Sequence, residues 1–211
     1  MKKTGSLLLM FILLSISTIQ AQNKSSLGIK IGMHSTKLSV PLEGEDTDYL
    51  SGVHVGAFYS MEFGKCRLQP GLIYVRRGGS KTVQNVAGIV TTQKIEQRSK
   101  LNYVEIPLEL SYKIFEFEKC NIRLSAEPYL GFALSGKFKS GDEETMVKIG
   151  EENGAINGDL RDKNYGVRVG TSLQFGMFEP YAGYDIGLGD VIYGPGVAYS
   201  NGLYFGLALH L

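Results

Sequence analysis

The sequence contains no tryptophan, two cysteines and three histidines among its 211 residues. Two cysteines are too few for a metal centre of their own, and no histidine lies at ligand spacing from either. The net charge is +1, so the chain has no basic field for collecting nucleic acid. Beyond the N-terminal segment there is no long apolar run of the kind that forms a spanning helix. We therefore expect no metal, no cofactor and no nucleic-acid partner.

The first 22 residues, MKKTGSLLLMFILLSISTIQAQ, have the layout of an export signal. Lys2 and Lys3 form a positive start, the segment 7–16 is apolar, and Ala21 stands where a signal peptidase cuts. The apolar segment is short for a spanning helix, although a retained anchor helix is the alternative. We expect a cleaved signal peptide over residues 1–21 and a single domain over 22–211 that works outside the cytoplasm.

The rest of the chain alternates apolar and polar residues with a period of two, which is typical of strands with two different faces. The composition, with 27 glycines, 12 tyrosines and 10 phenylalanines, is equally typical of strands and turns. We expect strands over residues 27–34, 52–61, 67–75, 102–114, 121–134, 165–175, 178–188 and 202–211. One face of these strands is apolar throughout and the other carries charges of both signs.

Alternation alone does not say which face points outward. A soluble sandwich or a soluble ligand-binding barrel would bury the apolar face, whereas a membrane barrel exposes it to lipid. The connections alternate between short ones, near residues 63–65, 116–119 and 176–177, and long ones over 40–51, 78–100, 136–162 and 189–201. Strands of about nine to thirteen residues suit a tilted bilayer crossing. We predict an all-β fold, an eight-stranded antiparallel up-and-down transmembrane β-barrel in the outer membrane.

An eight-stranded barrel is only wide enough to be filled by side chains, so charges inside it must pair. We expect a lumen that conducts nothing, with glycines leaving room for long arginines. The predicted ion-pair network consists of Lys30, Arg67, Glu105, Glu109, Arg123, Glu127, Arg168, Glu179 and Asp185.

Aromatic residues gather towards the expected strand ends, which favours an interfacial girdle built without tryptophan. The residues concerned are Tyr74, Tyr103, Tyr112, Phe115, Phe132, Phe175, Phe178 and Tyr193. The segment 202–211, GLYFGLALHL, is expected to be the strand that closes the barrel against the first one. This segment also resembles the C-terminal signal read by the outer-membrane assembly machinery, with Tyr204, Gly206, Leu209 and Leu211 at its positions, although that signal commonly ends in Phe. We therefore expect this machinery to be a partner.

Several stretches resemble the PorT-like family of small outer-membrane β-barrels. They are LQPGLIYVRRGG (68–79), LNYVEIPLELSY (101–112), PYLGFALSGK (128–137), YGVRVGTSLQF (165–175) and YAGYDIGLGDV (181–191). The resemblance implies an eight-stranded barrel with a periplasmic N-terminus. The family namesake is tied to a protein-secretion apparatus, but nothing in these residues singles out that role.

The cysteines, Cys66 and Cys120, each begin an expected strand at the periplasmic rim. The intervening strand would set their Cα atoms about 10 Å apart, beyond a normal bridge, although flexible turns could close the gap. A disulfide and two free thiols both remain open.

The histidines, His34, His54 and His210, all fall on the inward face, where filling the lumen is the favoured role. No serine sits in a nucleophile elbow, so catalysis is disfavoured. The remaining alternatives are a lipid-modifying outer-membrane enzyme and a secreted soluble ligand-binding barrel.

The long loops are the places where we expect binding, because loops on a rigid barrel commonly carry function. One is basic and could bind lipopolysaccharide phosphates: Arg76, Arg77, Lys81, Lys94, Arg98 and Lys100. Another is acidic and could bind a divalent cation, although it lacks EF-hand spacing: Asp142, Glu143, Glu144, Glu151, Glu152, Asp159 and Asp162. The two loops could equally pair with each other. We predict a monomer that acts through these loops, in structural, adhesive, assembly or secretion-related binding. The sequence does not identify the protein or ligand that the loops bind. The other expected partners are outer-membrane lipid and lipopolysaccharide.

Overall fold

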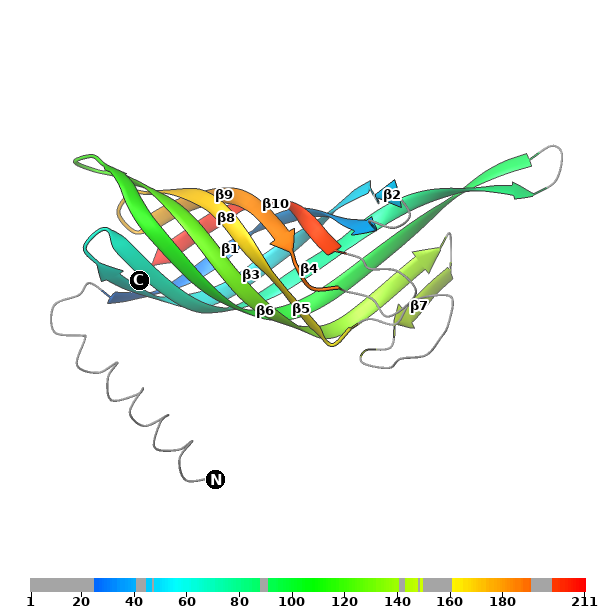
Figure 1. The fold of residues 1–211 in the computed structure, drawn as a ribbon, viewed down its shortest axis with the longest axis horizontal. Coiled ribbons are helices and arrows are strands. Elements are labelled where there is room, and N and C mark those ends of the chain that lie inside the picture. Colours follow the sequence, from blue (N-terminus) through cyan, green and yellow to red (C-terminus); the bar gives the residue numbers. More distant parts are fainter. Residues whose placement is uncertain are drawn as a thin grey trace, which may run out of the picture.

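Figure 1 shows the computed structural model of the chain. It describes residues 25–40, 45–46, 48–87, 91–140, 143–147, 149, 161–190 and 199–211. The predicted signal peptide lies outside these residues. No helix in the described part is long and apolar enough to cross a membrane.

The described residues form one antiparallel sheet that closes on itself. Eight long strands follow one another around it, and the last, β10, pairs with the first, β1. The eight are β1 (Ser25–Val40), β3 (Asp48–Phe63), β4 (Cys66–Ala87), β5 (Thr91–Glu116), β6 (Asn121–Ser140), β8 (Lys163–Gln174), β9 (Phe178–Gly187) and β10 (Tyr199–His210). Two short strands, β2 (Glu45–Asp46) and β7 (Glu143–Val147), pair with β1 and β6. The predicted eight-stranded up-and-down barrel is confirmed.

The seam between β1 and β10 is fully paired. Its register runs from Gly28↔His210 to Ser39↔Tyr199, and the Leu211 amide donates to the Leu27 carbonyl at 2.7 Å. The last segment therefore closes the barrel, as its alternation predicts, and the sheet has no free edge along the seam.

One end of the barrel, here called the turn end, carries the short connections. Gly64 and Gly176 adopt the left-handed backbone conformation there, with φ of 63° and 60°, which side chains other than glycine rarely adopt. Figure 1 places the C-terminus at this end. The opposite end, here called the loop end, carries the long connections.

The second long connection differs from its prediction. Residues 78–100 were expected to be a loop, but β4 continues to Ala87 and β5 starts at Thr91. From Thr82↔Glu96 to Ala87↔Thr91 these strands pair with each other after their described pairings with β3 and β6 have ended. The ribbon projects beyond the barrel in Figure 1. The alternation of apolar and polar residues does not predict this ribbon, because a two-stranded ribbon in solvent needs hydrogen-bonded backbones but no apolar face.

Burial settles which face points outward. On β5, Ile106, Leu108 and Leu110 are 51%, 41% and 52% exposed, whereas Glu105 and Glu109 on the opposite face are 0% and 8% exposed. This is the arrangement of a membrane barrel, with the apolar face outward and the charged face inside.

The aromatic residues at the turn end include Tyr112, Phe115, Phe175 and Phe178, all of them exposed. Their placement fits a girdle at the membrane interface. Tyr103 was assigned to the girdle incorrectly, because it lies on the inward face with Glu105 and is fully buried. Tyr193 lies outside the described residues.

Candidate functional site in the barrel interior

All nine side chains that the sequence assigns to the interior are buried. They come from six strands: Lys30 from β1, Arg67 from β4, Glu105 and Glu109 from β5, Arg123 and Glu127 from β6, Arg168 from β8, and Glu179 and Asp185 from β9. Because each strand alternates its faces, every second residue delivers a side chain to the same narrow lumen. Eight of the nine, Arg123 being the exception, join one connected set of ion pairs.

The half of this set towards the loop end is centred on Arg168. Its guanidinium pairs with Glu105, with Glu127 at 2.5 Å and with Asp185 at 3.2 Å. A second arginine, Arg77, shares two of these carboxylates, at 2.7 Å to Glu105 and 2.7 Å to Asp185. Two guanidinium groups thus share two fully buried carboxylates.

The Tyr129 ring lies beside both guanidinium groups. Their central carbons are 4.8 Å (Arg77) and 4.3 Å (Arg168) from the ring centroid. The Tyr129 hydroxyl donates to Asp185 at 3.0 Å. The ring therefore supplies both a cation–π surface and a hydrogen bond to the same cluster.

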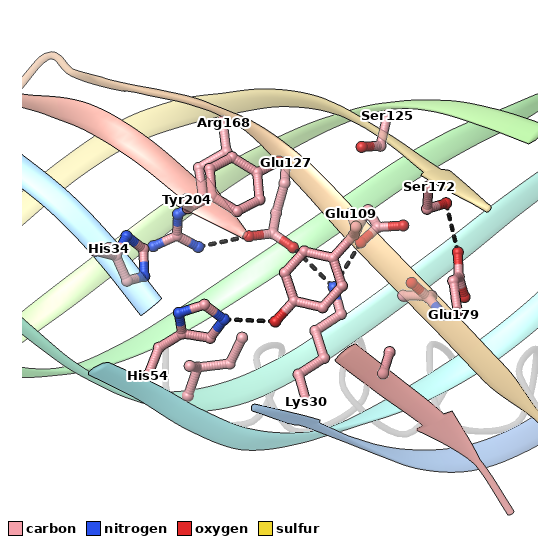
Figure 2. Close-up of a pocket in the computed structure, with 14 residues that line it drawn as sticks. Lys30, His34, His54, Glu109, Ser125, Glu127, Arg168, Ser172, Glu179 and Tyr204 are labelled. Atoms are coloured by element: carbon pink, nitrogen blue, oxygen red, sulfur yellow. Dashed lines mark hydrogen bonds and ion pairs between the residues drawn. The ribbon is translucent and has the colours of Figure 1, made fainter. Parts of the chain in front are cut away.

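The half towards the turn end is centred on Arg67. It donates two hydrogen bonds to Glu179, at 2.8 and 2.6 Å, and one to Glu109 at 3.1 Å. Lys30 joins the two halves, because its ammonium lies 2.5 Å from Glu109 and 3.2 Å from Glu127. Figure 2 shows this lysine reaching between the two carboxylates.

Two arginines depart from the prediction. Arg77 was assigned to a basic external loop but is 1% exposed inside the barrel. The sequence pattern could have placed Arg77 inside, because it lies an even number of residues from Arg67 and Gln69 on β4 and therefore shares their inward face. Arg123 is buried but pairs with Glu62 on β3 rather than with the predicted carboxylates.

Aromatic rings and histidines fill the space between the charges. The rings of His34 and His54 meet edge to face at 4.5 Å between centroids, and His54 Nε2 hydrogen-bonds the Tyr181 hydroxyl at 2.5 Å. Several glycines make room for aromatic or histidine rings rather than for arginine side chains, which corrects the expectation. A Cβ on Gly170 would lie 2.4 Å from the Tyr204 hydroxyl oxygen.

Little space remains between the side chains. The cavity beside Lys30, His34 and His54 has a volume of about 20 Å³, enough for one or two water molecules. Among the described residues no three His, Cys, Asp or Glu side chains are arranged to hold a metal ion. The interior is therefore packed as a polar core.

His210 is the histidine with both a hydroxyl and a carboxylate partner. Its Nδ1 lies 3.2 Å from Ser26 Oγ, and its Nε2 lies 2.5 Å from Glu179. The same carboxylate accepts hydrogen bonds from Arg67 and, at 2.6 Å, from the Ser172 hydroxyl. The hydrogen bonds from Ser26 through His210 to Glu179 thus connect β1, β10 and β9 at the turn end.

Cys66 and Cys120 are both free thiols in this structure. Cys66 is paired with Tyr112 on β5, and β5 separates β4 from β6, before which Cys120 lies. The intervening strand keeps the two thiols apart.

The residues of the predicted assembly signal lie on both faces of β10 and at its end. Tyr204 points inward and is 8% exposed, and Gly206 leaves room for the Tyr181 ring. Leu209 is half-buried and Leu211 is exposed. Of the acidic side chains predicted for the third loop, Asp162 is exposed. The others lie outside the described side chains: Asp142, Glu143, Glu144, Glu151, Glu152 and Asp159. The basic side chains of Lys81, Lys94 and Arg98 are likewise outside them.

Comparisons with known proteins identify the class. None of the curated proteins compared with the chain matches it. Among solved structures, Neisserial surface protein A (NspA) is 12% identical with a TM-score of 0.49, and Ail of Yersinia pestis is 14% identical with a TM-score of 0.44. Each comparison covers 89% of this chain and 99% of the other. The family model for the outer membrane protein beta-barrel domain matches residues 20–193, so the chain belongs to this family of outer-membrane barrels.

Proposed function

We propose that the protein is a non-conducting barrel of the PorT-like kind. It serves as a rigid scaffold whose parts outside the membrane bind a partner, in adhesion, assembly or secretion. The observation that carries the proposal is the β4–β5 ribbon. Its six pairs from Thr82↔Glu96 to Ala87↔Thr91 extend about 20 Å along the strands. Both of its edges offer backbone groups with which a partner strand could pair.

The packed interior supports the non-conducting part of this proposal. Ion passage would require a continuous water-filled path, but Arg168, Lys30 and Arg67 with their carboxylates cross the lumen at successive levels. Separating these buried pairs costs several kcal/mol each. We expect no steady conductance from the purified chain in planar bilayers.

Export by a signal peptide over residues 1–21, insertion as a monomer, and recognition of Tyr204, Gly206, Leu209 and Leu211 by the assembly machinery belong to the same proposal. We place no reaction in it. Glu179, the carboxylate behind His210, is already held by Arg67 and Ser172, so this histidine is better placed to join strands than to activate a hydroxyl.

The test compares three strains of the source bacterium: wild type, a strain lacking the gene, and a strain whose residues 83–95 are replaced by Asn-Gly. The replacement joins the paired residues Thr82 and Glu96 through a two-residue hairpin, so the barrel keeps its register. Cell sedimentation reports adhesion, and the protein content of the medium reports secretion.

We expect the ribbon-truncated strain to reproduce whatever defect the gene deletion causes. A band that shifts on boiling must show that the truncated barrel is folded. If this folded variant restores wild-type behaviour, the function does not reside in the ribbon and the proposal is wrong.

A further inference from the structure

The ribbon at the ends of β4 and β5 has two edges without a neighbouring strand in the described part of the chain. Pairing of β4 with β3 ends at Asp48↔Ser80, so residues 81–87 pair with β5 alone. Pairing of β5 with β6 starts at Gln97, which leaves residues 91–96 with one partner strand. A two-stranded ribbon is only marginally stable in water, and sheets become stable with three or more strands. The ribbon is therefore stabilised by a further strand.

The sequence of the ribbon does nothing to protect these edges. Exposed edge strands are commonly blunted by charged residues, proline or a bulge. Residues 82–93 contain no charged residue and no proline, and seven of the twelve are Val, Ile or Thr, which favour strands. The pairing from Thr82↔Glu96 to Ala87↔Thr91 is continuous. Such an edge is suited to pairing with another strand.

The β4 edge can pair with a second copy of itself over its whole free length. In antiparallel pairing about a two-fold axis one residue stands opposite itself, and for residues 81–87 that residue is Gln84. Val83 then stands opposite Asn85, and Lys81, the only charged residue of the seven, stands opposite an alanine. No like charges meet. The two edges would exchange about six to eight backbone hydrogen bonds over about 23 Å.

The β5 edge is less suited to the same pairing. A two-fold register opposes an odd number of residues, so at most five of residues 91–96 can take part. Of the two registers with five residues, the one centred on Lys94 sets two lysines opposite each other, which is destabilising. The other is centred on Gln93 and is two residues shorter than the β4 register. The β4 edge is therefore the better surface for a second copy.

The direction of β4 decides how two paired barrels would lie. The strand starts at Cys66 at the turn end and runs past the loop end to Ala87, along the projecting ribbon (Figure 1). An antiparallel strand runs the opposite way, so the second barrel lies beyond the tip of the ribbon with its loop end facing the first. Two copies in one membrane would instead present parallel β4 strands, a pairing that is slightly less stable per residue. Antiparallel pairing of the β4 edges thus joins two membranes.

We propose that the partner of the ribbon is a second copy of this chain in an opposing membrane, bound by antiparallel pairing of the two β4 edges about Gln84. The product is a four-stranded sheet in the order β5–β4–β4–β5. This inference rests on the proposed function, since it names the partner of the ribbon. Each barrel stays a monomer in its own membrane. A single contact of this size is weak, and many copies on two facing membranes add their strengths.

The experiment reconstitutes the full chain from detergent into phosphatidylcholine vesicles of two colours and counts two-colour clusters by fluorescence coincidence. Mixing loaded vesicles with vesicles that lack the chain tests whether the ribbon binds lipid instead. Digestion by an added protease counts the ribbons on the outer surface of each preparation. A shift on boiling shows that each variant barrel is folded.

The test variants set like charges opposite each other across the two-fold axis. Val83→Glu/Asn85→Glu opposes glutamates, Val83→Lys/Asn85→Lys opposes lysines, and each should cluster with itself roughly tenfold less than wild type. Vesicles of the two variants mixed together oppose glutamates to lysines and should cluster within about twofold of wild type. The matched control, Gln93→Glu/Ile95→Glu, puts the same charges at the paired positions of β5, one strand farther from the axis, and should also stay within about twofold.

The proposal is overturned if wild-type vesicles do not cluster with each other, or if they cluster equally with vesicles that lack the chain. Failure of the mixed variants to restore clustering, or an equal loss in the β5 control, would contradict pairing of the β4 edges about Gln84. Absence of clustering beside a persistent defect in the ribbon-truncated strain would sink this inference and leave the proposed function standing. Wild-type behaviour of that strain would count against the proposed function whatever the vesicles do.

Discussion

Replacing Glu105 by Gln removes one negative charge from the centre of the lumen and keeps the side-chain volume. Glu105 is 0% exposed and pairs with both Arg77 and Arg168. After the change the two guanidinium groups keep Asp185, and Arg168 also keeps Glu127. Two buried cations would thus share fewer carboxylates.

Breaking a buried ion pair by removing one partner costs about 3–5 kcal/mol. Because both arginines keep another carboxylate, we expect the lower end of this range, about 3 kcal/mol. With a urea dependence of about 2 kcal/mol per molar, the unfolding midpoint should fall by about 1.5 M.

The folded fraction of the chain in lipid vesicles, read from its unboiled gel mobility across a urea series, measures this shift. Glu118→Gln in the exposed turn after β5 is the matched control, with an expected change under about 0.5 kcal/mol. A midpoint for Glu105→Gln within 0.3 M of wild type would refute the view that buried ion pairing holds the interior together.

Three smaller tests follow from the same structure. Glu62→Gln should cost about 3 kcal/mol by the same gel assay, because it takes the carboxylate from Arg123, whose side chain is 0% exposed; a loss under about 1 kcal/mol would contradict this. Gly166→Ala should cost about 2 kcal/mol, because its Cβ would lie 2.4 Å from the Tyr129 hydroxyl oxygen, whereas Gly131→Ala meets Glu105 Cγ at 3.2 Å and should cost less. Maleimide should label two thiols per denatured chain without prior reduction, and fewer than two would indicate a bridge between Cys66 and Cys120.

The period-two pattern predicts the barrel well because a membrane barrel requires one apolar and one polar face on every spanning strand. The same parity places Glu105 and Arg168 inside without any knowledge of their partners. The period-two pattern does not predict the β4–β5 ribbon, because its strands extend beyond the barrel and need no apolar face.

The pairing of particular charges is a different problem. Arg123 has the right parity, but its position near the turn end brings it to Glu62 rather than to Glu109. Which arginine pairs with which carboxylate depends on how far neighbouring strands are shifted along one another in the barrel. The alternation of apolar and polar residues along each strand carries no information on this shift. The partners of the glycines depend on stagger in the same way.

The most direct test of the account is a photoreactive carbene reagent confined to the lipid tails of vesicles that hold the unmodified chain. Tandem mass spectrometry then reads which residues of β5 carry the label. We expect label on Ile106, Leu108 and Leu110 and none on Glu105 or Glu109. Label on the two glutamates, or a chain that acquires no label along β5, would contradict a barrel with lipid outside and charges within.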